Sequence, residues 1–182
     1  IHLEDVDCDL PESHLFNTVG STAGVTAEVA SMCGELGVRL VYASTDEIYG
    51  DVGDAVSSEE GPFALPGTTY ALGKLMGESL GLLYAPMGLT VLRISSPYGP
   101  GGKSPVVDLL FQALHGMPMT IRTQERSWCW IGDTVRGIRL AMEKGDGVYN
   151  IGRDDDATLM EVVAELACTM TGADKGLIKK VQ

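Results

Sequence analysis

Apolar residues follow two spacings along the chain, one typical of strands and one typical of helices. Residues 38–43 and 90–95 are short runs of mainly β-branched and other apolar residues, which predicts two buried strands. Shorter strands are expected at 1–3, 119–121 and 147–152. Other apolar residues recur three or four positions apart and predict helices near 25–36, 69–83, 105–115, 134–144 and 159–170. Because helices and strands alternate, we expect a parallel sheet with helices packed on it.

Capping residues set the expected ends of several helices. Gly37 is placed to end the first helix, since glycine readily adopts the backbone conformation found there. Asp133 is interpreted as the N-cap of a helix over 134–144. Thr158 and Glu161 form a capping-box pattern at the start of the last helix.

The helix expected at 69–83 has two distinct faces. One face carries the apolar stripe Leu72, Leu75, Met76, Leu80 and Leu83. The other face carries small residues four positions apart: Gly73, Gly77 and Gly81. Small residues let another backbone approach closely, which leaves two interpretations of this face. It contacts a second subunit, or it packs on the chain's own sheet.

Composition sets the class of protein and narrows its partners. The 182 residues are 45% hydrophobic and 21% charged, which is typical of a globular domain with its own core. A formal net charge of −12 disfavours nucleic acid and anionic membranes as partners, and no apolar run is as long as a membrane span. The scattered cysteines have no metal-ligand spacing, which predicts no metal site and free thiols in a reducing cytoplasm: Cys8, Cys33, Cys129 and Cys168.

Polar residues gather directly after the first of the two longer strands. They are Ser44, Thr45, Asp46 and Glu47. Ligands of parallel sheets bind beyond the carboxyl ends of the strands, so this segment is the candidate site. Tyr70 and Lys74 lie one turn apart on the helix that follows. A tyrosine hydroxyl has a pKa of about 10, and a neighbouring ammonium can supply the lowering of roughly 3 units needed for a base near neutral pH.

The order of these motifs resembles that of the extended short-chain dehydrogenase/reductase family, the NAD-dependent sugar-nucleotide epimerases and dehydratases. The segments that carry the resemblance are 17–22, 42–50, 70–74, 93–100 and 126–133. The fourth is similar to the family's Arg-x-x-Asn-x-Tyr-Gly-Pro, with Ser96 in place of the usual asparagine. The fifth is similar to the family's Arg-x-aromatic-x-aromatic-Val-x-Asp.

The resemblance implies an α/β fold class: a Rossmann-like, doubly wound parallel sheet that is incomplete at the N-terminus. Residues 1–99 would form the later part of an NAD-binding domain that carries the catalytic residues. Residues 100–182 would form a smaller substrate-binding part, with a strand and helices that return to the sheet. In relatives the tyrosine–lysine helix helps to form a dimer, so a homodimer through 70–83 is expected.

The resemblance also implies roles for the candidate catalytic residues. Tyr70 would take the proton from the C4 hydroxyl of the sugar while a hydride passes from C4 to NAD. Lys74 would hold the nicotinamide ribose and lower the pKa of Tyr70. Thr45 would donate a hydrogen bond to the developing C4 carbonyl oxygen.

Four other assignments concern the cofactor and the substrate. By the same resemblance, Ser44 and Ser95 are expected beside the cofactor, together with Tyr70. Ser96 and Arg126 are expected to bind the nucleotide-sugar substrate. The arginine would grip the diphosphate, a task that suits its forked guanidinium.

The pair Asp46 and Glu47 bears on which reaction follows oxidation at C4. Loss of water across C5 and C6 needs one group to take the C5 proton and another to protonate the departing hydroxyl. Thr-Asp-Glu followed by x-Tyr-Gly is similar to the dTDP-glucose 4,6-dehydratases, which implies Glu47 as the base and Asp46 as the acid. A 4-epimerase of the same family, which needs no such pair, is the alternative.

One family feature is missing from the sequence. No glycine-rich turn that would hold the pyrophosphate of NAD opens a helix in the right context. Glu4 and Asp5 occupy the place that lies beside the cofactor phosphates in relatives. Two interpretations remain: the sequence is a fragment of a complete enzyme, or it is a catalytically silent short relative that acts as a partner subunit.

Overall fold

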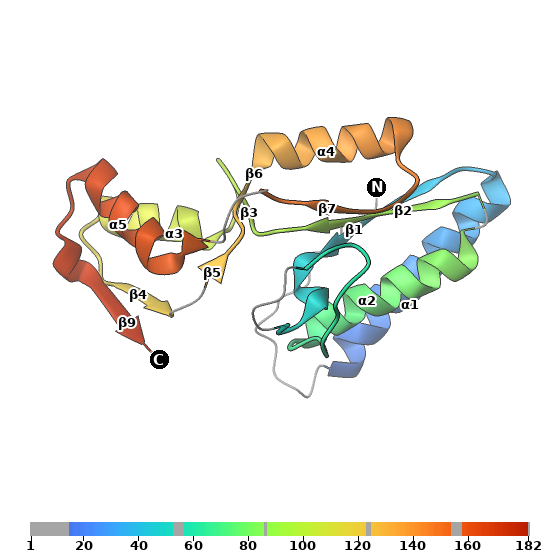
Figure 1. Cartoon of the computed structure of the whole chain (residues 1–182), viewed down its shortest axis with the longest axis horizontal. Helices are drawn as coiled ribbons and strands as arrows, with labels where there is room; N and C mark the ends of the chain where they lie inside the picture. Colours follow the sequence, from blue (N-terminus) through green and yellow to red (C-terminus); the bar gives the residue numbers. More distant parts are fainter. Residues whose placement is uncertain (1–14, 53–56, 86, 123–124, 154–157, 182) are drawn as a thin grey trace. The chain divides into compact units, whose positions relative to one another are not determined.

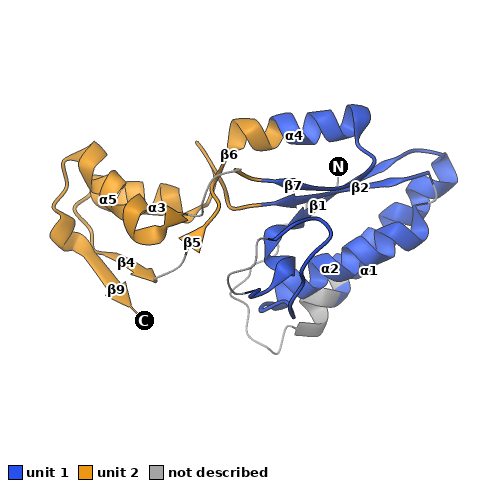
Figure 2. Ribbon diagram, in the orientation of Figure 1, with its two compact units in different colours: residues 1–94, 136–151 blue, residues 95–135, 152–182 orange. Residues whose placement is uncertain are grey.

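The structure of the chain is a computed structural model that describes residues 15–52, 57–85, 87–122, 125–153 and 158–181. They form two compact units, coloured separately in Figure 2. Unit 1 comprises residues 1–94 and 136–151, and unit 2 comprises 95–135 and 152–182. The chain passes from unit 1 to unit 2 after residue 94 and returns to unit 1 for residues 136–151. The division into functional parts expected at residue 99 remains a prediction.

Unit 1 is built on a parallel sheet of three strands in the order β1–β2–β7 (Figure 1). Helices α1 and α2 lie on one face of the sheet and α4 on the other. The elements are α1 (Leu15–Leu36), β1 (Leu40–Thr45), the 3₁₀ helix η2 (Asp46–Tyr49), α2 (Thr69–Tyr84), β2 (Leu89–Ile94), α4 (Ile131–Lys144) and β7 (Gly147–Ile151). Helix α4 belongs to unit 1 from residue 136 onward, and its first five residues belong to unit 2 (Figure 2).

The side chains of β1 and β2 alternate between the two faces, as the pleat of a strand requires. Tyr42 and Val91 join the core beneath α1 and α2. Val41 and Leu92 join a second core with Ala141 of α4. Both faces of the sheet are therefore covered, which explains why these strands are continuous apolar runs.

The buried face of α2 is not the one that its leucines would indicate. The buried residues are Ala71, Gly73, Lys74, Gly77, Glu78 and Gly81. A Cβ on Gly77 would lie 2.2 Å from the Tyr42 hydroxyl oxygen, so only glycine lets the helix lie this close to β1. The interpretation of the glycine face as a subunit contact is therefore wrong. The leucine stripe lies outside, with Leu72, Met76 and Leu83 exposed by 37%, 41% and 71%.

The described residues of unit 2 include two complete helices and three pairs of short strands. Strands β3 and β6 pair in parallel, as do β4 and β9, whereas β5 and β8 are antiparallel. Helices α3 and α5 pack on each other around Leu109, Met119 and Ala164. The elements are β3 (Pro97–Tyr98), α3 (Pro105–Leu114), β4 (Met119–Arg122), β5 (Glu125–Arg126), β6 (Cys129–Trp130), β8 (Thr158–Leu159), α5 (Met160–Thr171), η3 (Lys175–Leu177) and β9 (Ile178–Val181).

Two of the predicted helix starts are wrong and one predicted end is confirmed. Helix α4 begins at Ile131, so Asp133 lies in its first turn and is not the N-cap. Helix α5 has no side-chain cap, because Thr158 lies in β8, paired with Arg126. Gly37 follows α1 with a φ of +66°, the left-handed conformation expected of a terminating glycine.

Several expectations fall outside the described residues. They are the strand at 1–3, the acidic pair Glu4 and Asp5, and the side chain of Asn17. Within the described part of the chain, no helix combines the length and apolar character needed to cross a membrane.

Candidate active site

The carboxyl end of β1 carries the predicted catalytic hydroxyl and carboxylates. Ser44 and Thr45 are the last residues of β1, and η2 begins immediately at Asp46. The Thr45 side-chain oxygen accepts a hydrogen bond from the backbone N–H of Glu47, at 3.3 Å, and so caps η2. This cap holds the hydroxyl and the two acids together at the strand tip.

Helix α2 carries the predicted base into the same region. Its N-cap is Thr68, whose side-chain oxygen accepts from the backbone N–H of Ala71 at 3.1 Å. The Thr68 hydroxyl also donates to Glu47 Oε2 at 3.3 Å. The start of the helix is thereby joined to η2, and Tyr70 lies in its first turn.

Lys74 connects the predicted base to β1. The residue is buried, with only 3% of its surface exposed, and its Nζ donates to the carbonyl oxygen of Ala43 at 3.2 Å. Nζ also lies 5.8 Å from the ring centroid of Tyr70 and 5.3 Å from that of Tyr42. A neighbouring ammonium favours the phenolate form of a phenol, and the expected effect of Lys74 on Tyr70 remains a prediction.

A buried ion pair behind these residues was not predicted from the sequence. Arg93 of β2 and Glu78 of α2 are 5% and 4% exposed and form a two-pronged contact. The Ser44 hydroxyl donates to the same carboxylate and thus has a partner within the protein. The expected contact of Ser44 with the cofactor remains a prediction. Two signals pointed to this pair: an arginine inside an apolar strand, and a glutamate one helical turn beyond Lys74.

Two of the predicted substrate-binding residues, Ser96 and Arg126, contact each other in unit 2, whereas Thr45 belongs to unit 1. The guanidinium of Arg126 donates from Nη1 to the Ser96 side-chain oxygen at 3.4 Å. Ser95 is buried, and its side-chain oxygen would lie 3.0 Å from a Cβ added to Gly152. The Ser96 hydroxyl and the Arg126 guanidinium form a polar group that is suited to an anion, and the predicted contact of Ser95 with the cofactor remains a prediction.

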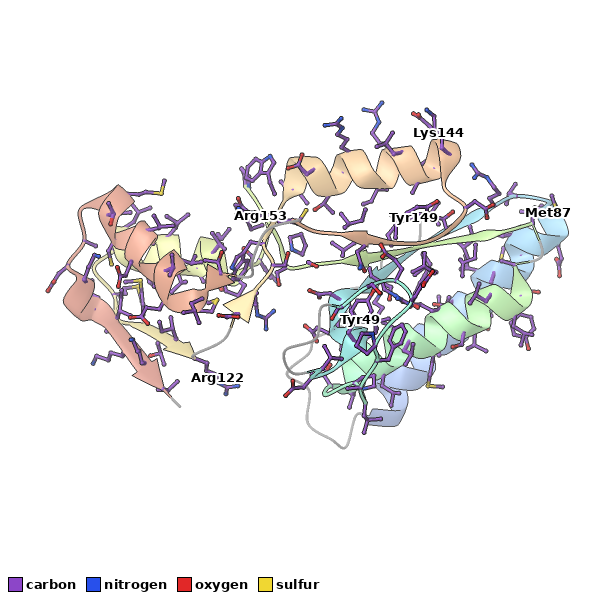
Figure 3. All side chains as sticks on the ribbon, in the orientation of Figure 1. Tyr49, Met87, Arg122, Lys144, Tyr149 and Arg153 are labelled. Atoms are coloured by element: carbon purple, nitrogen blue, oxygen red, sulfur yellow. The ribbon has the colours of Figure 1, made fainter. Side chains whose placement is uncertain are left out.

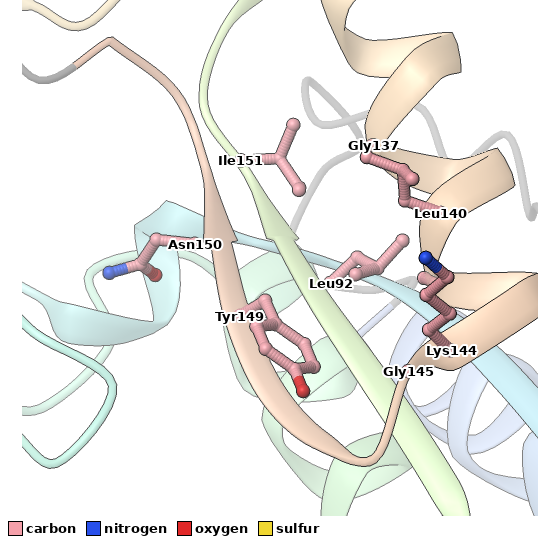
Figure 4. Close-up of a pocket in the computed structure, with 9 residues that line it drawn as sticks. Leu92, Gly137, Leu140, Lys144, Gly145, Tyr149, Asn150 and Ile151 are labelled. Atoms are coloured by element: carbon pink, nitrogen blue, oxygen red, sulfur yellow. The ribbon is translucent and has the colours of Figure 1, made fainter.

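Each unit has a hollow whose lining residues differ from those at the tip of β1. In unit 1, a cavity of about 310 Å³ lies between α4 and the sheet, on the face opposite α2 (Figure 4). In unit 2, a mainly apolar hollow of about 750 Å³ lies between α3 and α5, and Trp128 lines it. Neither hollow includes any of the predicted catalytic residues.

Comparison with known proteins identifies the family. Residues 12–152 match the model of the NAD-dependent epimerase/dehydratase family. The chain belongs to this family. NAD is the cofactor named for the family. The Rossmann-like parallel α/β fold expected from the sequence is confirmed by the parallel sheet and by the solved structure described below.

The relatives of the chain in this family act on nucleotide sugars, as their names state. A dTDP-glucose 4,6-dehydratase of Streptomyces niveus is 30% identical, over 93% of this chain and 55% of the relative. The UDP-glucuronic acid decarboxylase 6 of Arabidopsis thaliana is 32% identical, over 75% of this chain and 44% of the relative. The chain therefore spans about half the length of these relatives.

A solved structure shows the same arrangement of elements. The dTDP-glucose 4,6-dehydratase of Bacillus anthracis, solved in complex with NAD, superposes with a TM-score of 0.83 at 28% identity. The match covers 95% of this chain and 58% of that enzyme.

The polar groups that α2 brings beside the end of β1 have the chemistry needed to hold the nicotinamide ribose of NAD. A buried ammonium beside a phenol and a threonine hydroxyl offers donors and acceptors for ribose hydroxyls and a carboxamide. Lys74 and Tyr70 would therefore hold the nicotinamide ribose. The parallel sheet places them at the carboxyl ends of the strands, where such ligands bind.

Proposed function

We propose that the protein carrying this chain is an NAD-dependent nucleotide-sugar 4,6-dehydratase, which oxidises C4 and removes water across C5 and C6. The observation that carries the proposal is the buried Lys74 ammonium, joined to Ala43 of β1 and placed 5.8 Å from the Tyr70 ring. Family membership and relatives named as dehydratases support the substrate class. When bound, NAD would supply the hydride-accepting chemistry that oxidation at C4 needs.

The first step is removal of the C4 hydroxyl proton. Tyr70 takes this proton as the phenolate, and the ammonium of Lys74 stabilises the negative charge that the phenolate carries. The Thr45 hydroxyl donates to the C4 oxygen as it becomes a carbonyl. Its position is fixed because the same oxygen caps η2.

The second step is loss of water, which we assign to the two acids of η2. Glu47 takes the C5 proton, which the new C4 carbonyl has made more acidic. Asp46 gives its proton to the hydroxyl that leaves C6. C6 would then take back the hydride removed from C4, and C5 would take back the proton from Glu47, so the net change in the sugar is the loss of one water molecule. The bond between Thr68 and Glu47 keeps this base at the start of the helix that carries Tyr70.

The nucleotide diphosphate is assigned to the polar group of unit 2. Arg126 binds it through its guanidinium, and Ser96 donates a hydrogen bond from its hydroxyl. A serine is shorter than the asparagine of relatives, so the arginine supplies the main part of this contact. We place the protein in the cytoplasm, in agreement with the free thiols of Cys33, Cys129 and Cys168.

Changing Glu47 to glutamine separates the two steps and tests the proposal. The full-length protein would be incubated with NAD and dTDP-glucose or UDP-glucose, and the mass of the nucleotide-sugar product would be measured by mass spectrometry. The unchanged protein should give a product lighter by one water molecule. Glu47→Gln should slow water loss by roughly 100-fold or more, because the amide cannot take the C5 proton, while oxidation at C4 persists.

Glu60→Gln is the control, since Glu60 is an exposed glutamate of the neighbouring loop. It should leave both steps unchanged. A product of unchanged mass with inverted configuration at C4 would instead identify the 4-epimerase alternative. Water loss that survives Glu47→Gln would contradict the role of Glu47.

We also propose a homodimer formed through the outer surface of the 70–83 helix. The support is apolar exposure on two helices that pack against each other. Helix α2 exposes Met76 and Leu83, and α1 exposes Met32 and Leu36 by 58% and 72%. A surface of this kind commonly marks an interface. The pair Met76→Glu and Leu83→Glu should shift the mass in light scattering from dimer to monomer, and Met117→Glu in unit 2 should not.

A further inference from the structure

The ion pair of Arg93 and Glu78 joins three elements beneath the candidate site. Arg93 donates from Nε to Glu78 Oε1 at 3.2 Å and from Nη2 to Oε2 at 2.8 Å. The Ser44 hydroxyl donates to Oε1 of the same carboxylate. The buried carboxylate of Glu78 thereby links β1 and β2 to α2, the helix that carries Tyr70 and Lys74.

The remaining guanidinium nitrogen of Arg93, Nη1, binds η2 and the loop that follows it. Nη1 donates to the Tyr49 hydroxyl at 3.0 Å and to the backbone carbonyl of Glu59 at 3.1 Å. The guanidinium also lies 5.1 Å from the ring centroids of Tyr49 and Phe63, which stack on each other. Tyr49, labelled in Figure 3, ends η2, and Glu59 and Phe63 belong to the 57–65 loop.

The 57–65 loop is fastened further through β7 and η2. The Tyr49 hydroxyl donates to Asn150 Oδ1 at 2.7 Å, and the Asn150 backbone N–H donates to Glu59 Oε1 at 2.8 Å. The Ala64 N–H donates to the Tyr49 carbonyl at 2.7 Å. The hydrogen bond from Asn150, with help from the charge of Arg93, lowers the pKa of Glu59 below its usual value. The loop is therefore held as a closed network of charge-assisted bonds.

We propose that Arg93 is a positioning residue that fixes the Tyr70–Lys74 helix, the acids of η2 and the 57–65 loop in one arrangement. The inference adds a residue to the proposed function and rests on it for its catalytic consequence only. Arginine is required because its rigid fork can bind the carboxylate with two nitrogens while the third binds Tyr49 and Glu59. A lysine keeps the charge but has one nitrogen, so it cannot join both sides.

Hydrogen exchange measured by NMR tests this arrangement without any turnover. The reporters are the backbone amides of Ala64 and Asn150, which donate to Tyr49 and Glu59 of the network. The references are the amides of Ala85 and Ala173, which donate to helix carbonyls outside it. In Arg93→Lys the reporter amides should exchange at least about 10-fold faster, while the references stay within about twofold. Unchanged reporter amides would overturn the proposal.

A second variant covers the case in which Arg93→Lys loosens the whole chain and all four amides exchange faster. Tyr49→Phe keeps the ring stack and deletes only the hydroxyl between Arg93 and Asn150. It should accelerate exchange at the Asn150 amide and leave Ala85 and Ala173 unchanged. Equal exchange at Asn150 in Tyr49→Phe and the unchanged protein would then overturn the proposal.

Steady-state kinetics of the full-length protein test the catalytic consequence. Arg93→Lys should lower kcat about 10-fold or more with KM within about twofold, because the reacting groups are misplaced while Arg126 still binds the diphosphate. Lys175→Gln, which breaks an exposed ion pair with Glu165, should change neither value. A kcat that is unchanged in Arg93→Lys would overturn the positioning role. If the unchanged protein turns over no nucleotide sugar, the proposed function fails, and hydrogen exchange still decides the arrangement.

Discussion

Replacing Tyr70 with phenylalanine is expected to slow C4 oxidation by roughly 100- to 10,000-fold, the usual contribution of a positioned acid or base. The change deletes only the phenol oxygen, so the ring beside Lys74 and the helix remain. Without that oxygen, no group in the proposed mechanism takes the C4 hydroxyl proton. The measurement is the initial rate of cofactor reduction in a single turnover, with the NAD-loaded protein in excess over the nucleotide sugar.

Tyr84→Phe is the matched control for this prediction. Tyr84 is the last residue of the same helix and is exposed. Its substitution makes the same chemical change four turns away, and the oxidation rate should stay within about twofold. A Tyr70→Phe protein that oxidises C4 at the rate of the Tyr84→Phe protein would contradict the assignment of the base.

Replacing Gly77 with alanine should cost about 2–4 kcal/mol of unfolding free energy. The new Cβ would lie 2.2 Å from the Tyr42 hydroxyl oxygen and 2.8 Å from its ring carbon Cζ. Tyr42 is fully buried and its hydroxyl donates to the Lys74 carbonyl at 3.3 Å, so the tyrosine or the helix must shift and strain this bond. The better helix propensity of alanine, about 1 kcal/mol, offsets only part of this cost.

Gly24→Ala provides the comparison, measured by the same urea unfolding curves. Gly24 lies on α1, and a Cβ there meets no atom within 4 Å. The alanine should therefore stabilise the protein by up to about 1 kcal/mol. If the two variants shift the unfolding midpoint equally, the close approach of α2 to Tyr42 is not what requires glycine at position 77.

The strands and the order of elements could be predicted because their signals are local. The apolar runs at 38–43 and 90–95 became β1 and β2, shifted by one or two residues at their ends. The grouping of Thr45, Asp46 and Glu47 at a strand tip followed from the same pattern. These features depend on residues close together in the sequence, where periodicity and polarity are informative.

The faces of the helices could not be predicted, because they depend on what each helix meets. Helix α5 buries the small residues Ala164 and Ala167, while Leu166 and Met170 of its predicted apolar stripe are exposed by 55% and 76%. Small residues are buried where two backbones approach closely, and spacing alone does not reveal that approach. The same reason explains the inward glycine face of α2.

The pairing of Arg93 with Glu78 also could not be predicted from residue spacing. The two residues are 15 positions apart and belong to different elements. A charged residue within an apolar strand indicates that some partner exists, because an unpaired buried charge is very costly. Which residue serves as the partner is decided by how α2 lies on the sheet, and that is a property of the folded chain.

The central claim is that Lys74 makes the phenol of Tyr70 acidic, and an NMR titration of tyrosine tests it most directly. The full-length protein would carry tyrosine labelled at Cζ, and the Tyr70 signal would be assigned by its loss in Tyr70→Phe. The account predicts that Tyr70 titrates well below the usual pKa of about 10 and that Lys74→Met moves its titration up toward that value. A Tyr70 that titrates at the same pH with and without Lys74 would contradict it.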